Sequence, residues 1–286
     1  MNRFDVRSQS SRLRAADGNA KHFRIAAVCA GVAAVLALLC LMAPLIVHYD
    51  PNRISLRELN RPPGGGHWLG TDKGGRDVGA RLLYGGRTTL LIGAAATLLI
   101  GAIGTAVGLT AAYLGGWADA VLMRLTDLVL AFPFLIVVTV VKSLWPGGGV
   151  PALISVAGLL GWGGFARLIR ARTLSEKHSD YVLAARALGA GPLRIMVRHL
   201  LPALLPVWTV QGVWTFASML AAESSLGFLG FGVPAGEPSW GNMLAEAASL
   251  QTLRHEWWVW APAGGCMVVM ILAAHAVGEA WKTVYK

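Results

Sequence analysis

Long apolar runs alternate with short charged stretches along most of this chain. The first run, residues 25–47, contains no Asp, Glu, Lys or Arg, and a helix of that length is long enough to cross a hydrocarbon core of roughly 30 Å. Five further runs are also mainly apolar. The pattern therefore predicts six membrane-spanning helices, at about residues 25–47, 88–114, 122–144, 150–166, 200–222 and 257–278.

The charge on the connecting segments predicts how the chain is oriented. Residues 167–198 are rich in arginine, whereas residues 223–256 carry four glutamates against one arginine. Because basic segments tend to stay in the cytoplasm, we expect 167–198 to be cytoplasmic together with both termini. The basic loop 49–87 would then face outward, against this statistical bias. The expected fold class is an all-α membrane protein, with a cytoplasmic tail 1–24 and one transmembrane domain 25–286.

The composition agrees with a membrane protein. Of 286 residues, 55% are hydrophobic and 14% are charged, and the charges are bunched between neutral runs. The formal net charge of +10 would fit a nucleic-acid-binding protein, but most basic residues flank apolar runs, where they determine topology. We therefore expect membrane lipid, and not nucleic acid, as a partner. Cys29, Cys40 and Cys266 lie inside apolar runs without a CxxC spacing and are expected to be free thiols.

Motifs for catalysis are missing from the sequence. It contains no GxxxxGK[ST] phosphate-binding loop, no HExxH zinc motif and no GxSxG elbow. None of the seven histidines forms an i, i+4 pair suited to a metal ion. His275 lies inside the last apolar run, and an interior histidine explains it more readily than a path-lining one. The chain is predicted to be neither an enzyme nor a holder of a metal or cofactor.

A few local patterns predict geometry within the bundle. Gly104 and Gly108 have the spacing that lets two helix backbones approach closely in lipid, although glycine is common in membrane helices in any case. Pro133 should kink the third span, and Arg124 is placed to face Asp127 three residues later. The tryptophans at 257, 258 and 260 are typical of a membrane interface.

The centre of the chain contains a short polar helix between two spans. Residues 180–188 can form about two and a half turns, with Asp180 near the helix N-terminus. Val182, Ala185 and Gly189 share one face. Gly189 is suited to a left-handed C-terminal cap, and Pro192 prevents the helix from continuing. From the residues alone, a rigid lever for a partner protein and an ordinary amphipathic loop helix explain this segment equally well.

Four blocks of the sequence resemble permease subunits of the dipeptide, oligopeptide and nickel class of ABC importers. They cover most of residues 61–260 in family order: LGTDKGGRDVGARLLYGGRTTLLIG, GWADAVLMRLTDLVLAFP, the central segment containing DYVLAARALGAG, and ESSLGFLGFGVPAGEPSWGNML. The chain departs from the family pattern at Leu183, where many members have Glu, and at His199, where an aliphatic residue is usual. Its ending HAVGEAWKTVYK also lacks the usual Asp-rich C-terminus.

The resemblance implies a type I ABC importer permease with six spans in the bacterial inner membrane. Its implied partners are a homologous permease in a heterodimer, two cytoplasmic ATPases that bind ATP and Mg, and an external solute-binding protein. The segment 167–199 is implied to be the coupling loop, with these residues meeting the ATPase: Asp180, Tyr181, Val182, Ala184, Ala185, Arg186, Leu188 and Gly189.

An outward gate is the second expected site. A small, polar and aromatic run follows the uncharged fifth span within the last matching block, and we expect it to close the translocation path, although an ordinary interfacial loop is the alternative. The residues concerned are Glu223, Ser224, Ser225 and Phe228.

The substrate that the resemblance most readily implies is a peptide. Nickel chelates, glutathione and opine-like solutes are alternatives for the same architecture. A stand-alone secondary carrier or channel would instead have internal repeats with broken helices and ionisable groups within the membrane. A membrane scaffold would have no lever for an ATPase.

Overall fold

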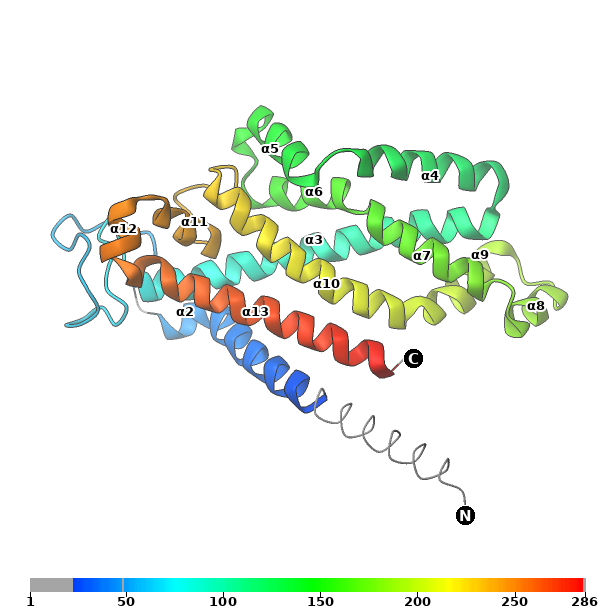
Figure 1. Ribbon diagram of the computed structural model, residues 1–286, viewed down its shortest axis with the longest axis horizontal. Coiled ribbons are helices and arrows are strands. Elements are labelled where there is room, and N and C mark those ends of the chain that lie inside the picture. Colours follow the sequence, from blue (N-terminus) through cyan, green and yellow to red (C-terminus); the bar gives the residue numbers. More distant parts are fainter. Residues whose placement is uncertain (1–22, 48, 285–286) are drawn as a thin grey trace, which may run out of the picture.

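The computed structural model describes residues 23–47 and 49–284, and within them it is built from helices with no strand. The long helices lie along one axis of the molecule (Figure 1). α8 lies at one end of this axis, whereas α11, α12 and the loop before α3 lie at the other. The expected all-α fold class is therefore confirmed. The tail 1–24 lies outside the described residues except for Phe23 and Arg24.

The helices follow one another with short connections, apart from the loop that precedes α3. Their bounds are a first helix Phe23–Leu41, α2 Ala43–Ile46, α3 Val78–Leu114, α4 Gly116–Ala131, α5 Phe134–Leu144, α6 Gly149–Gly161, α7 Gly163–Glu176, α8 Asp180–Ala187, α9 Pro192–Ile195, α10 Leu201–Phe228, α11 Trp240–Ala245, α12 Leu250–His255 and α13 Trp257–Val284. Short 3₁₀ turns lie at Pro146–Gly148 and Glu246–Ala248, and a π-helical stretch, Met196–Leu200, joins α9 to α10.

Four helices of the described chain are long and apolar enough to cross a membrane, or up to six if each of two bent pairs is one span. The second span is longer than expected, because α3 begins at Val78 and not near residue 88. The fifth span is also longer than expected. The helix runs from Pro192 to Phe228, whereas the sequence predicted a span over residues 200–222. The protein is thus a multi-pass membrane protein whose helices extend beyond the uncharged runs.

The expected kink at Pro133 is a complete break. α4 and α5 meet there at 81°, with Phe132 in an extended conformation. A residue before proline is disfavoured in the helical region, and proline donates no backbone hydrogen bond. The expected span 122–144 is therefore two helices. A second bend, of 45°, separates α6 from α7 near Trp162.

Two glycines of α3 allow a close contact with α7. A side chain added at Gly104 would place its Cβ 2.8 Å from Cβ of Phe165 and 3.1 Å from the carbonyl oxygen of Trp162. Gly108 faces α7 in the same way, at the carbonyl oxygen of Ala166. Close approach of two backbones requires small residues at this spacing. The prediction from Gly104 and Gly108 is confirmed.

The end remote from α8 is capped by the loop before α3 packed against the start of α13. Arg81 donates from Nη1 to Oδ2 of Asp72 at 2.7 Å, and both side chains are buried. Trp258 Nε1 donates to the carbonyl oxygen of Thr71 at 3.3 Å. Trp258 is therefore buried beneath the cap, and only its neighbour Trp257 is exposed in the way expected of an interfacial tryptophan. The residues 78–87, expected as loop, are the first turns of α3.

Candidate functional site

Ion pairs to α4 hold the helix α7, which leads into the central polar segment. Arg170 contacts Asp119 with two atoms, Nε to Oδ1 at 2.6 Å and Nη2 to Oδ2 at 2.5 Å. Arg167 Nη2 lies 2.6 Å from Oδ1 of Asp127. The other carboxylate oxygen of Asp127, Oδ2, lies 4.0 Å from Nη1 of Arg124, the partner expected from sequence. The first ten residues of the expected coupling loop 167–199 are thus helical and fixed against α4.

α8 is short, and its end is defined by Gly189. The Gly189 N–H donates to the carbonyl oxygen of Arg186 at 2.9 Å, and the Ala190 N–H donates to that of Ala185 at 3.0 Å. These two bonds are the Schellman arrangement, which requires a left-handed residue just past the helix. Gly189 has φ +80°, as predicted. Asp180 lies in the first turn, although no side-chain hydrogen bond caps that end.

The two faces of α8 differ from expectation. Val182 is fully buried in a cluster that includes Ile169 and Ile195, and Ala185 is only 8% exposed. The face that sequence analysis assigned to an ATPase therefore packs against this chain at both positions. Sequence spacing groups residues on one face but does not reveal which face turns inward.

The exposed side of α8 carries apolar residues. Leu188 is 89% exposed, and Leu183 and Ala184 are also exposed.

Two polar side chains of α8 contact other parts of the chain. Arg186 lies 5.2 Å from the ring centroid of Tyr113 on α3, a cation–π distance. Tyr181 donates its hydroxyl to Oε2 of Glu176 at 3.1 Å, and burial raises the pKa of this phenol. Contacts on both sides thus hold α8 in place and leave Leu183, Ala184 and Leu188 uncovered.

The expected outward gate is helical and not a loop. Glu223, Ser224, Ser225 and Phe228 all belong to α10. Glu223 is 1% exposed, and its Oε2 accepts from Thr89 Oγ1 at 3.2 Å. Thr89 Oγ1 in turn accepts from the Trp240 N–H at 3.1 Å. Glu223 therefore joins α10 to α3 and, through Thr89, to α11.

The other three gate residues lie together. Ser224, Ser225 and Phe228 line a cavity of about 400 Å³ with Leu229 and Leu244. Ser225 Oγ donates to the carbonyl oxygen of Ala221 at 2.9 Å, and Phe228 is 55% exposed. The predicted gate residues thus lie in two different environments. The Glu223 carboxylate is buried, whereas Ser224, Ser225 and Phe228 line an open cavity.

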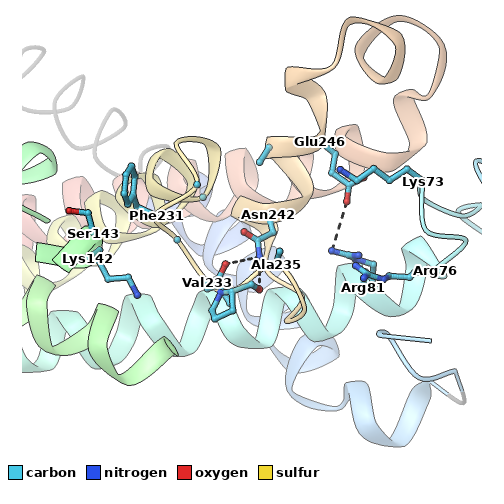
Figure 2. A pocket seen from close by; sticks show the side chains of 15 residues that line it. Lys73, Arg76, Arg81, Lys142, Ser143, Phe231, Val233, Ala235, Asn242 and Glu246 are labelled. Atoms are coloured by element: carbon cyan, nitrogen blue, oxygen red, sulfur yellow. Dashed lines mark hydrogen bonds and ion pairs between the residues drawn. The ribbon is translucent and has the colours of Figure 1, made fainter. Parts of the chain in front are cut away.

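A larger cavity, of about 700 Å³, was not expected from the sequence. It lies between α5, the segment after α10, α11 and the start of α3, and Figure 2 shows its lining. Lys142 reaches it from α5. The available signal was one lysine within an otherwise uncharged run from residue 128 to residue 144.

Among the described residues, no three His, Cys, Asp or Glu side chains are grouped to hold a metal ion.

These features define an integral membrane protein: a bundle of helices long and apolar enough to cross a membrane, with a short exposed helix at one end and a folded cap at the other. The chain belongs to the family described as the binding-protein-dependent transport system inner membrane component, whose model matches residues 104–280. The type I ABC permease fold of that family agrees with the architecture expected from the sequence.

Curated relatives support the same family. A protein of Brucella suis biovar 1 described as a peptide permease is 38% identical over 236 residues, which are 82% of this chain and 78% of the relative. The oligopeptide transport system permease protein OppC of Lactococcus lactis subsp. lactis is 36% identical, over 77% of this chain and 74% of the relative. The glutathione transport system permease protein GsiD of Pectobacterium atrosepticum is 36% identical, over 78% and 74%. These relatives are named as transport permeases and not as enzymes.

Proposed function

We propose that this chain forms half of the translocation path of an ATP-driven importer for peptides. The relatives are named for peptides, oligopeptides and glutathione, all of which are peptide solutes. Nickel chelates and opine-like solutes remain alternatives for the same architecture.

The observation that carries this proposal is the exposed apolar face of α8, formed by Leu183, Ala184 and Leu188. A short polar helix such as α8 does not need solvent-exposed leucines in order to fold. Exposed apolar groups on a fixed protrusion instead support a partner contact. α7 connects this face to the bundle, so that a displacement of α8 is transmitted to α3 and α4 through close packing and ion pairs.

The partners in this proposal are a second, homologous permease, two cytoplasmic ATPases and an external solute-binding protein. ATP and Mg bind to the ATPases, since this chain has no phosphate-binding loop. α8 and its flanking residues 177–191 meet an ATPase, and closure of the ATPases moves α8 and tilts the bundle. The α8 end and both termini lie in the cytoplasm, while the cap formed by residues 49–77, α11 and α12 faces outward.

Purification of the chain from its native membrane in a mild detergent tests the proposal. An importer subunit is expected to bring down a second permease and an ATPase in a fixed ratio. A chain that is isolated alone and moves solute in vesicles without ATP would instead be a carrier or channel. Isolation with membrane partners but without an ATPase would point to a scaffold, and either result contradicts the proposal.

A further inference from the structure

The 700 Å³ cavity lies at the end of the molecule remote from α8. Its walls come from distant parts of the chain: the end of α5, the segment 230–235 after α10, α11, and the residues around the start of α3. This volume lies within the range of small-molecule sites, about 300 to 1,000 Å³. The cavity is therefore large enough for an organic solute and not only for water.

Its charged lining is predominantly basic. Four cationic side chains and one carboxylate line the cavity: Lys73, Arg76, Arg81, Lys142 and Glu246. Arg81 is already paired with Asp72 at 2.7 Å and lies 3.9 Å from Glu246. Glu246 is the one carboxylate among these lining residues, and burial raises its pKa. The remaining cations give the cavity a positive potential.

Lys142 is a buried cation of this lining. It is 6% exposed, and within the described part of the chain no carboxylate lies within ion-pair distance of it. Its Nζ lies 3.5 Å from the carbonyl oxygen of Gly149, which is a long and therefore weak hydrogen bond. A buried ammonium is stable only when it is paired and hydrogen-bonded. An anion in the cavity would satisfy this requirement.

The position of Lys142 distinguishes it from the other cations. Figure 2 shows Lys142 on the α5 side of the cavity and Lys73, Arg76 and Arg81 on the other side, with Val233, Ala235 and Asn242 between them. Asn242 Nδ2 donates to the carbonyl oxygens of Val233, Pro234 and Glu237 at 3.0, 3.2 and 3.1 Å. These hydrogen bonds fix the wall formed by Val233, Pro234 and Ala235, whose side chains are apolar. The cavity thus combines a buried cation with an apolar surface, which suits an organic anion.

We propose that this cavity binds the carboxylate of an organic solute and that Lys142 pairs with it. The inference rests on the proposed function in one respect, that the solute is the imported peptide, bound through its C-terminal carboxylate after delivery at this end. The other reading of Lys142 is structural: an ammonium near the C-terminus of α5 offsets the helix dipole and joins α5 to Gly149.

Direct binding of trialanine and trialanine amide tests the inference, because the two probes differ only in the C-terminal carboxylate. The full-length chain is used in the assembly in which it is isolated from membranes, and affinities are measured by calorimetry without ATP. We expect the wild type to bind the acid at least about tenfold more tightly than the amide. Lys142→Met should reduce this ratio to about one, whereas Lys142→Arg should retain most of it.

Lys282→Met is the matched control, because Lys282 pairs with Glu279 on α13 and does not line the cavity; its ratio should equal that of the wild type. Membrane levels and thermal unfolding confirm that each variant is folded. Equal binding of acid and amide by the wild type, or an unchanged ratio in a folded Lys142→Met variant, would overturn the inference. Inorganic phosphate binding more tightly than trialanine, with the same dependence on Lys142, would assign the cavity to a phosphate such as a lipid headgroup and would also overturn it. Since no uptake is measured, the outcome is separate from that of the proposed transport function.

Discussion

Arg170 and Asp119 form a two-point ion pair, with Nε at 2.6 Å and Nη2 at 2.5 Å from the two carboxylate oxygens. Two parallel hydrogen bonds fix the relative orientation of two side chains as well as their distance. The pair joins α7 to α4, and α7 leads directly into α8. In the proposed mechanism, this pair is the contact through which a displacement of α8 and α7 would reach α4.

Replacing Arg170 by lysine should weaken this connection. Lysine keeps the charge but cannot make the two-point contact, so we expect a loss of about 1 kcal/mol in the free energy of unfolding and fewer solute molecules imported per ATP hydrolysed. Arg172→Lys is the control, since Arg172 pairs within α7 with Glu176. Calorimetry and reconstituted vesicles measure the two quantities. An Arg170→Lys variant with wild-type values in both would remove α7 from the coupling route.

Substitutions on the exposed face and on the buried face of α8 should have different effects, one on ATPase binding and the other on the stability of the chain. Leu188→Asp should leave stability unchanged and prevent the ATPase from co-purifying, because Leu188 is 89% exposed. Ala185→Trp should instead destabilise the chain itself, by about 1 to 3 kcal/mol, since a large side chain must replace a methyl group that is only 8% exposed. Co-purification and thermal unfolding distinguish the two variants. The assignment of the faces is wrong if Ala185→Trp folds normally while Leu188→Asp unfolds.

The hydrogen bond from Thr89 to Glu223 should matter for the stability of the end of the bundle remote from α8. Glu223→Gln keeps an oxygen that accepts from Thr89, whereas Glu223→Leu leaves a buried hydroxyl unsatisfied, which costs about 1 to 3 kcal/mol. We expect near-normal unfolding temperatures for the first variant and a clear decrease for the second. Ser225→Ala, which loses only a bond within α10, is the control. Equal stability of the glutamine and leucine variants would argue against a structural role for this contact.

His67 should make the stability of the cap depend on pH. Its Nδ1 lies 2.6 Å from Asp77 and its Nε2 lies 3.4 Å from Glu58, and the hydrogen bond to Asp77 raises the pKa of His67. A raised pKa in the folded state means that protonated His67 stabilises the fold below its unfolded pKa, and that this contribution is lost as the pH rises through the folded value. Thermal unfolding of the wild type and His67→Gln should therefore differ more at pH 5 than at pH 8. A difference that grows with pH would contradict this linkage.

The orientation can be tested at sites that the structure makes suitable. Ser239 is fully buried, so a cysteine there would not react on either side of the membrane. Gly236 in the same segment and Ala187 on α8 are exposed. In a background without Cys29, Cys40 and Cys266, an impermeant reagent on intact cells should label Gly236→Cys and not Ala187→Cys. The reverse pattern would invert the proposed topology.

The features that the sequence predicted well depend on short-range chemistry. Gly189 needs only its own φ, Pro133 only its missing N–H, and the pair Gly104 and Gly108 only the helical period. The features that it missed depend on contacts between distant positions. Thr89 and Glu223 are 134 positions apart, and a glutamate after an uncharged run therefore looked like the start of a loop.

The orientation of α8 was missed for the same reason. Spacing places Val182 and Ala185 on one face, but only the packing of Val182 with Ile169 and Ile195 and the low exposure of Ala185 show that this face is buried. Lys142 was visible as a lone charge in a span, yet the cavity beside it is assembled from residues 73 to 246 and has no sequence pattern of its own.

Gly189→Val tests the central claim most directly. No atom lies within 4 Å of a Cβ added at Gly189, so the substitution acts only through φ +80°, which a β-branched residue adopts at a cost of about 1 kcal/mol or more. Gly189→Asn is the control, because asparagine tolerates this conformation. The measurement is ATP-dependent uptake of a labelled oligopeptide by the complete assembly in vesicles. We predict ATP-dependent uptake by the wild type, most of it retained in Gly189→Asn and most of it lost in Gly189→Val at normal membrane levels. Uptake without ATP, or wild-type uptake by Gly189→Val, would contradict the claim that α8 couples ATP hydrolysis to transport.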